Sequence, residues 1–475
     1  MSSEVRRAAQ ANPIEEPLPI RKYRADPLLY AIVLFTWTAV WRVQDLFPIL
    51  AAVKFPLLIQ GVALIMYLAN QTPERRLQWI KSPILTITLI LLAIMIVGLP
   101  SSLWPGKGFT FITRDFLPTV LLMVVLASSV RESSDLEWLA FAHLCGGFVY
   151  AAVIFLKYDV GPNGRLGELI YYDANDLAMI MVCTIPFAVF FLRPGVAVWR
   201  RGIALTALML FVVMIIRSGS RGGFLGLIAI GAYILLRYKA VPTRLRLGAV
   251  VGGTLLLLVV GSSGYWEMMG TLLNPKDDYN MTDETGRSKV WKRGIGYMVT
   301  HPVLGVGVRA FPQAEGMLSQ ISKEYAARGK GIKWSVAHNS FVEIGAELGM
   351  IALILFISML WIAIRDLARV GKGPRGSPYE TADDSAFAQM IIASLVGYIV
   401  CGFFVSAEYF TYLYVLLALV IGQQAVFRRR ARQKLPLQRT TTGGTGGGTG
   451  KGIGTKKPLR IAPPPIRPQW LPTGS

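Results

Sequence analysis

Cysteine and histidine are both scarce in this sequence. The three cysteines, Cys145, Cys183 and Cys401, each lie inside an apolar stretch. Their spacing fits neither a disulfide framework nor a set of metal ligands, which excludes a small disulfide-stabilised domain and a cysteine-based zinc site. Because the whole chain has only three histidines, a histidine in a polar stretch is a rare feature.

Charged side chains are also sparse, and long apolar runs lie between them. Charged residues make up 16% of the 475 residues, whereas apolar residues make up 53%. The apolar residues come in blocks of about 20, the length that a helix needs to cross the hydrocarbon core of a bilayer. The composition therefore predicts an all-α polytopic membrane protein. Residues 1–25 are polar and show no cleavable signal peptide, so the first span is expected to be an uncleaved anchor.

The apolar runs predict twelve transmembrane helices, with one long connection between the ninth and the tenth. That connection, residues 263–338, is too long for a simple loop and is predicted to be a domain of its own. The predicted spans are residues 28–46, 49–69, 83–101, 110–130, 137–157, 174–193, 202–216, 222–237, 247–262, 340–364, 386–405 and 411–427.

Lysine and arginine predict the orientation of these spans, because loops rich in them stay in the cytoplasm. With the N-terminus inside, every inside connection carries at least one of these residues, and short outside loops carry one or none. Both ends are therefore predicted to be cytoplasmic. The resulting division is an N-terminal segment (1–27), helices one to nine (28–262), an outside loop domain (263–338), helices ten to twelve (339–427) and a tail (428–475).

The net charge of +21 needs no nucleic acid as a partner. Inside-loop charges orient the spans and contact anionic membrane lipids. The tail is a separate case, because residues 440–454 are almost entirely Gly and Thr and because Pro463–Pro465 follows them. Such compositions do not build a packed core, so residues 428–475 are predicted to be a disordered basic tail.

A short polar turn, Arg217-Ser-Gly-Ser-Arg221-Gly-Gly, joins two apolar runs that are shorter than an ordinary membrane span. We therefore expect the turn to dip toward the membrane, where irregular backbone is tolerated if it lines a cavity. Arginines at that depth are expected to meet anions. The alternative is a tight external turn whose arginines touch lipid phosphates.

A basic segment lies in the middle of the loop domain. It holds Arg287, Lys289, Lys292 and Arg293, and residues 288–299 can form an amphipathic helix that ends at His301-Pro302. A basic, partly apolar helix suits the membrane surface and a phosphate headgroup. The charge pattern alone allows equally a helix that binds only anionic lipid.

The stretch from Val336 to Met350 places polar residues at the start of an apolar run. A helix that starts near Asn339 holds His338 at its N-terminal end and carries Glu343 and Glu347 on one face. Burying such groups in lipid is costly, so we expect them to face other protein or a wet cavity. The alternative is that Asn339 is only an N-cap and that the glutamates only bind neighbouring helices.

These pieces, taken in order, resemble a known family. The Ser220–Gly223 turn, the Gly286-Arg287…Trp291 helix with its Gly305-Val306-Gly307 sequel, and the His338-Asn339…Glu347-Leu348-Gly349 stretch are similar to the O-antigen ligase and polymerase superfamily. Members of that superfamily are integral glycosyltransferases of the bacterial envelope. The resemblance in motifs covers roughly residues 200–365, and elsewhere it is one of hydropathy alone.

The resemblance implies a transfer at the periplasmic face of the bacterial inner membrane. The donor is a glycan on undecaprenyl diphosphate, and the acceptor is a glycan hydroxyl, in ligases that of a lipid A core sugar. Arg221 and Arg287 are the expected catalytic donors to the diphosphate leaving group, because arginine binds phosphate oxygens in a bidentate manner. His338 is the expected general base. The residues expected to bind substrate are Arg217, Arg293, Glu343 and Glu347.

The outside loops contain no Asp-x-Asp metal motif, so we expect catalysis that needs neither metal nor cofactor. The resemblance implies a direct displacement that inverts the anomeric centre. A polymerase of the same superfamily is an open alternative, because the acceptor site leaves no recognisable motif. A transporter or flippase is a further alternative. The cationic loop domain and the lack of a detectable internal repeat argue against it.

Overall fold

The computed structural model describes residues 26–161, 165–167, 169, 171–239, 241–273, 283, 285–331, 334–370 and 381–441, with side chains up to residue 432. Most of the predicted N-terminal segment and residues 442–475 of the predicted tail lie outside the described residues. Within them the chain is helical, and one β-bridge joins Val160 to Leu166. Residues up to Ala431 form one unit, and a second begins at Arg432.

The elements include one π-helix, η4, and several 3₁₀ turns. In chain order they are α2 (Pro27–Ala39), α3 (Val43–Leu46), α4 (Pro48–Ala52), α5 (Phe55–Ala69), η1 (Pro73–Arg75), η2 (Leu77–Ile80), α6 (Pro83–Gly98), η3 (Leu99–Ser101), α7 (Pro105–Phe111), η4 (Ile112–Phe116), α8 (Leu117–Ser129), α9 (Ser133–Lys157), α10 (Ala174–Phe191), α11 (Val198–Ser218), α12 (Arg221–Arg237), α13 (Thr243–Val260), α14 (Ser263–Gly270), α16 (Arg287–Thr300), α17 (Phe311–Met317), α18 (Gln320–Ala327), α19 (Ser340–Val370), α20 (Ala382–Gly402) and α21 (Thr411–Thr441).

The prediction of an all-α membrane protein is confirmed, whereas the number of twelve spans is not. Among the described residues, nine helices are long and apolar enough to cross a membrane. The first two predicted spans contain shorter apolar helices, α2 and α5, of 13 and 15 residues. Between them the helical backbone is broken at Arg42 and Lys54, which adopt φ values of 49° and 51°. These breaks leave α3 and α4 as separate short helices. Sequence hydropathy alone does not distinguish such a broken segment from a continuous membrane span.

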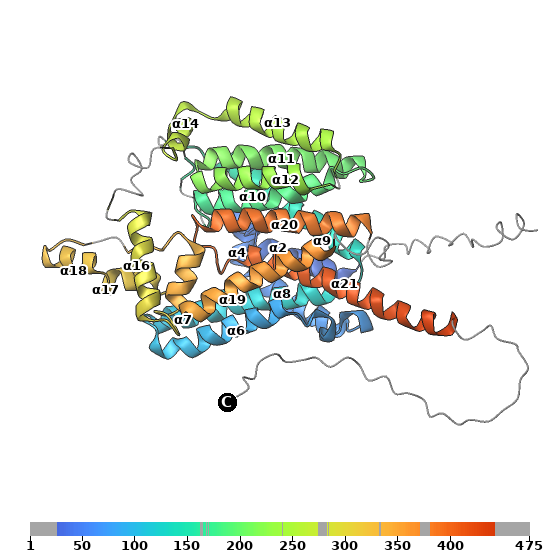
Figure 1. Cartoon of the computed structure of the whole chain (residues 1–475), viewed down its shortest axis with the longest axis horizontal. Helices are drawn as coiled ribbons and strands as arrows, with labels where there is room; N and C mark the ends of the chain where they lie inside the picture. Colours follow the sequence, from blue (N-terminus) through green and yellow to red (C-terminus); the bar gives the residue numbers. More distant parts are fainter. Residues whose placement is uncertain are drawn as a thin grey trace, which may run out of the picture. The chain divides into compact units, whose positions relative to one another are not determined.

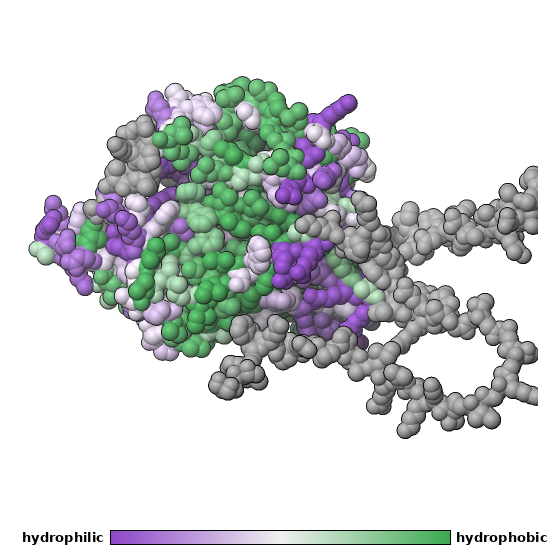
Figure 2. Space-filling view, in the orientation of Figure 1, coloured by the Kyte–Doolittle hydropathy of each residue, from purple (hydrophilic) through white to green (hydrophobic). Residues whose placement is uncertain are grey.

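Long helices of the first unit run side by side, and α16 lies across their ends (Figure 1). In the space-filling view a broad apolar belt separates hydrophilic surfaces at the two ends of the bundle (Figure 2). α10 lies in the interior, with 89% of its apolar window buried, whereas α13 has only 11% buried and lies at the edge. The belt is the surface that a bilayer covers, and the two hydrophilic ends face water on either side of it.

Ion pairs gather at the end of the bundle that we call the basic end. Arg75 pairs with Asp26, Arg193 with Asp383, and Arg430 with Asp384. All of these residues belong to segments predicted to be inside. The helix α21 continues through this end, where Arg429 donates hydrogen bonds to the carbonyl groups of Glu74 and Val130. The predicted start of the tail, residue 428, therefore falls within a helix.

The opposite end, which we call the loop end, carries the loop domain. It holds α14 and α16 to α18, the turn between α11 and α12, the connection from α20 to α21, and the first residues of α19. The predicted helix within the loop domain is confirmed as α16, which ends at Thr300, with His301 as its C-cap just before Pro302. Every residue predicted from the sequence to act in the site lies at this end.

Candidate functional site

α19 consists of two helical segments that meet at Gly349. This glycine has φ 86° and ψ 174°, and the backbone on either side of it is helical. A Cβ at this position would stand 2.6 Å from the carbonyl oxygens of Pro302 and Val303, so only glycine fits. The predicted span 340–364 is thus divided: residues 340–348 form a short helix at the loop end, and the long helix begins after Gly349.

The end of this short helix is closed by the loop domain. The amide of Val306 donates to the carbonyl of Ala346 at 2.9 Å, and the amide of Gly307 donates to that of Glu347 at 2.9 Å. Carbonyl groups at a helix C-terminus lack partners within the helix, and these two bonds supply them. Gly305, with φ 62°, approaches the Glu347 backbone so closely that a Cβ would clash at 2.3 Å. The Gly-Val-Gly sequence is therefore a docking segment.

Glu343 and Glu347 are fully enclosed and bind loops at this end. Glu347 accepts hydrogen bonds from the amides of Arg309 and Phe311 and from the hydroxyl of Tyr409. Glu343 accepts hydrogen bonds from the amide of Ala337 and the hydroxyl of Ser406. Both side chains were expected to bind substrate. Their partners are the protein's own loops, and they face protein rather than lipid.

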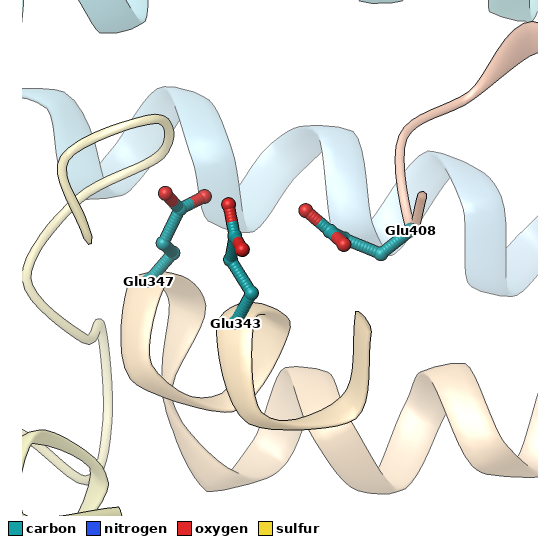
Figure 3. A group of neighbouring side chains, drawn as sticks. All are labelled: Glu343, Glu347 and Glu408. Atoms are coloured by element: carbon teal, nitrogen blue, oxygen red, sulfur yellow. The ribbon is translucent and has the colours of Figure 1, made fainter. Parts of the chain in front are cut away.

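Glu408, which the sequence did not single out, faces these two glutamates from the connection between α20 and α21 (Figure 3). It is 0% exposed, and neither carboxylate oxygen has a hydrogen-bond partner. Burial and the neighbouring charges of Glu343 and Glu347 raise the pKa of Glu408 well above its ordinary value. The only sequence signal is a lone acidic residue in a short connection between two apolar runs.

The three carboxyl groups form a compact cluster, with ligand oxygens within 4.8 Å of one another. Such a set is a candidate for holding a cation. Arg309 contributes one positive charge beside it: burial lowers the pKa of this guanidinium, but the charges of Glu347, Glu343 and Glu408 outweigh burial and raise it. The cluster is thus partly neutralised by the protein itself.

His338 lies directly before α19 and is held from both sides. Its own backbone has φ 49°, a conformation that is uncommon for residues other than glycine. The carbonyl of the preceding Ala337 accepts a hydrogen bond from the Trp291 indole at 2.9 Å. The following Asn339 caps α19, because its side chain accepts from the amides of Phe341 and Val342. The position of His338 is therefore fixed by its neighbours.

Arg287 is the first residue of α16, one helical turn before Trp291. Residues four apart lie on the same face of a helix, so Arg287 shares its face with the indole that binds beside His338. α16 also packs on α19, where a Cβ on Gly294 would meet Val342 at 2.5 Å. The two sequence-distant stretches that carry Arg287 and His338 are thus in contact.

Arg221 begins α12, directly after a tight turn. Ser220 is 1% exposed and caps this helix, and Gly219 ends α11 with φ 58°. The Arg221 guanidinium donates to the Thr271 hydroxyl at 2.8 Å. The turn is buried in protein rather than standing clear of the bundle.

The α20–α21 connection links α12 to α19. Gly222, next to Arg221, lies against Phe404, since a Cβ there would stand 2.8 Å from the Phe404 Cβ. Next to Phe404 in this connection, the carbonyl of Val405 accepts from the hydroxyl of Ser340 of α19, which in turn accepts from the amide of Ala407. Through this connection the starts of α12 and α19 are joined at the loop end.

Arg217 and Arg165 support the turn between α11 and α12. Arg217 donates to the carbonyl groups of Phe155 and Tyr158 at 2.9 and 2.7 Å. Arg165, which the sequence analysis did not single out, donates to the carbonyl of Ser218 and to the Asn175 side chain. Its segment has no motif and no apolar run, which left no signal for it in the sequence.

Arg293 lies in an ion pair within the loop domain. Its guanidinium approaches the Glu315 carboxylate at 2.6 Å, and the Tyr297 hydroxyl donates to the same carboxylate at 2.8 Å. Burial and the Glu315 charge raise the pKa of Tyr297, so this hydroxyl remains a donor. The pair joins α16 to α17.

Of the other histidines, His143 is 3% exposed among the rings of Trp41, Phe187 and Tyr412. His301 contacts only the neighbouring Thr300 hydroxyl among the bonds described. His338 is therefore the histidine that adjoins α16, because Trp291 of that helix donates to the carbonyl of the residue before it.

In sequence, the chain matches no curated protein. A protein-family model described as O-antigen ligase matches residues 205–357. The matched region contains Arg217, Arg221, Arg287, His338 and the glutamates of α19. The match confirms the resemblance seen in the motifs, and it supports membership of this chain in the O-antigen ligase superfamily.

Proposed function

We propose that this protein is a glycosyltransferase that moves a glycan from undecaprenyl diphosphate to an acceptor hydroxyl. The observation that carries the proposal is the family match, which spans every residue assigned to catalysis. The contacts that join α12, α16 and α19 at the loop end support it. α12 begins with Arg221, α16 begins with Arg287, and α19 begins at Ser340, two residues after His338.

The reaction is a direct displacement. The acceptor oxygen attacks the anomeric carbon, the bond from that carbon to the diphosphate oxygen breaks, and the anomeric centre is inverted. His338 takes the acceptor proton on an imidazole nitrogen, and Arg221 and Arg287 bind the diphosphate as its negative charge increases. Since arginines supply this stabilisation, the proposal requires neither metal nor cofactor.

The glutamates have a supporting role in this proposal. Glu343 binds the backbone next to His338, and Glu347 binds the segment that closes the same helix. Arg217 holds the turn before Arg221. Arg293 acts through the ion pair that fixes α16 on α17. We further propose that any of these four side chains can also contact the sugar of the substrate.

The orientation follows from the charges. The basic end carries the segments that the lysine and arginine pattern assigns to the cytoplasm. In a bacterial inner membrane the loop end then faces the periplasm, which is where a lipid-linked glycan and a lipid A core sugar meet. The polymerase alternative has the same donor, with a second lipid-linked glycan as the acceptor.

Deletion of the gene followed by analysis of surface glycans tests the proposal. Loss of attached glycan, with lipid-linked polymer accumulating, is the result expected for a ligase. Accumulation of single repeat units identifies a polymerase instead. Unchanged surface glycans together with unchanged lipid-linked intermediates contradict both activities. Accumulation of the lipid-linked intermediate on the cytoplasmic face of the membrane identifies a flippase instead.

A further inference from the structure

A second cationic site lies in a cavity at the loop end. The cavity has a volume of about 560 Å³ and lies between α5, the η4 region and the start of α21. Four cationic side chains and one carboxylate line it: Arg42, Lys54, Arg114, Arg309 and Asp115. The volume is in the range of sites for single small ligands or headgroups, roughly 300–1,000 Å³. An excess of positive charge in a hollow of this size is complementary to an anion.

Part of this charge is not balanced by an ion pair within the described protein. Arg42 forms an ion pair with Asp45 at 2.7 Å. In the described part of the chain, Lys54, Arg114 and Arg309 form no ion pair. The Arg309 guanidinium lies 5.4 Å from the centre of the Phe111 ring, and the buried charges of Glu343, Glu347 and Glu408 balance part of its charge. Lys54 and Arg114, which form no ion pair in the described part of the chain, favour binding of phosphate in the cavity.

The backbone around the cavity is unusual. The described residues other than glycine with positive φ are Arg42, Lys54, Arg309 and His338. Three of these four line the cavity, and the fourth is the proposed base. The wall also contains the π-helix Ile112–Phe116, which carries Arg114 and Asp115. Left-handed backbone in such residues is strained and gathers at binding sites, as do π-helical turns.

The cavity is bordered by lipid-facing and aromatic surface. Leu57 of α5 lines it and is 67% exposed, and Ile49 of the preceding short helix is 74% exposed. Tyr171 also lines it, with the Arg42 guanidinium 3.9 Å from its ring centre. The combination suits a ligand with three parts: an acyl or prenyl chain along α5, a phosphate among the cations, and a sugar against the aromatic rings.

The cavity and the proposed catalytic site share one support. Glu347 holds the amide of Arg309, which lines the cavity, and Glu343 holds the amide of Ala337, next to His338. The two glutamates are one helical turn apart, about 6 Å along the axis. One short helix thus positions a residue of each site.

We propose that this cavity binds the phosphate-bearing headgroup of a second lipid-linked substrate, the acceptor; this rests on the proposed transferase function. Three of its four cations lie outside the residues that match the family model, whereas Arg221, Arg287 and His338 lie within them. The donor diphosphate occupies the Arg221 and Arg287 site, and the acceptor headgroup enters from the lipid side of α5. Its sugar hydroxyl then reaches His338.

Native mass spectrometry of the purified full chain with undecaprenyl diphosphate tests the site directly. The wild type is expected to bind two lipid molecules. The double variant K54A/R114A changes two exposed side chains and should bind one, as should R221A/R287A, which removes the other site. K107A is the matched control, because Lys107 is a cation on α7 outside the cavity lining, and it should bind two. Binding of two molecules by K54A/R114A would overturn the proposal.

A second arm distinguishes a lipid phosphate from a free one. Inorganic pyrophosphate, added at the same concentration, should leave the lipid bound to the cavity of R221A/R287A. Displacement of the lipid at that concentration would show that the cavity takes free phosphate and would overturn the lipid part of the proposal.

Kinetics separate the roles of the two substrates. In K54A/R114A the KM for the acceptor should rise at least tenfold while the KM for the donor stays within twofold of wild type. A rise in the donor KM instead would assign the cavity to the donor and sink this inference while leaving the transferase function intact. A wild type that transfers glycan from its lipid-linked donor neither to a lipid A core nor to a second lipid-linked glycan would contradict the proposed function itself.

Discussion

Glu343 accepts a hydrogen bond from the backbone amide of Ala337 at 3.0 Å, and this bond ties the residue before His338 to the helix that follows it. The Glu343 carboxylate, six residues after Ala337, therefore helps to fix the position of the proposed base His338. The same carboxylate is fully buried and also accepts from the Ser406 hydroxyl. Glu343 is in this way a positioning residue whose effect on transfer acts through His338.

Glu343→Ala is expected to lower both stability and turnover. The substitution leaves the Ala337 amide and the Ser406 hydroxyl without an acceptor in a buried place, which costs about 1–3 kcal/mol per unpaired group. Turnover should fall because the loop that carries His338 loses its anchor. The measurements are the thermal midpoint of unfolding and kcat per folded molecule.

Glu343→Gln is the rescue variant for that prediction. Its amide oxygen can still accept from Ala337, so kcat should recover most of the loss. If Glu343→Gln is as inactive as Glu343→Ala although both fold, the carboxylate itself takes part in the reaction and the positioning role is wrong.

Gly349→Ala is expected to prevent correct folding of the loop end. A Cβ at this position meets the Pro302 carbonyl at 2.6 Å, and the positive φ adds strain of about 1–3 kcal/mol. Gly248→Ala in α13 is the control, because a Cβ there meets nothing within 4 Å and should change stability by only about 1 kcal/mol. Equal thermal midpoints for the two variants would show that the junction at Gly349 is not needed.

The sequence predicted the class of the fold better than its division into helices. Long apolar runs are enough to identify membrane helices, and the Pro302 stop correctly ended α16. Hydropathy could not predict the breaks at Arg42 and Lys54, because a left-handed residue inside an apolar run leaves the average unchanged. Gly349 was likewise read as part of one span, since its role depends on a carbonyl of a distant loop.

The candidate site was predicted in part, for a similar reason. Glu343 and Glu347 stood out because two carboxylates i, i+4 in an apolar run are costly unless they have partners. Their partners, Arg309, Ala337 and Tyr409, are known only from the tertiary contacts. Local patterns identify residues that need a partner, whereas the identity of that partner requires the fold.

Glu408 is expected to make stability depend on pH. Burial and the charges of Glu343 and Glu347 raise its pKa in the folded state above the ordinary value of 4.5. The folded state then holds the proton more tightly than the unfolded state, so the contribution to stability is complete below pH 4.5 and is lost as the pH rises through the raised pKa.

Thermal unfolding of wild type and Glu408→Gln between pH 4.5 and 9 measures this dependence. The wild type should lose stability with rising pH, and Glu408→Gln, which cannot ionise, should lose less. Glu267→Gln, at an exposed position, is the control and should follow the wild type. Parallel curves for wild type and Glu408→Gln would mean that Glu408 is ionised in the folded protein throughout.

Arg221→Lys and Arg287→Lys are each expected to slow transfer about 10–100-fold, as follows from losing roughly 1.5–3 kcal/mol of a charged hydrogen bond. Lysine keeps the charge but not the fork that binds two phosphate oxygens. Arg328→Lys, at an exposed position of the loop domain, is the control and should transfer at the wild-type rate. Rates within twofold of wild type for both variants would show that charge alone suffices and that bidentate binding is not required.

His338→Ala should fold and insert normally, bind the lipid-linked donor, and transfer little. The local backbone does not depend on the ring, since Trp291 binds the Ala337 carbonyl and Asn339 caps α19 through its own side chain. Loss of a general base costs about 10²–10⁴-fold in rate. The measurement is transfer by purified His338→Ala across pH 6 to 8, with donor binding measured in parallel. Turnover at the wild-type rate over that range removes His338 from the mechanism, whereas lost donor binding with normal turnover of the bound fraction assigns it to substrate binding alone.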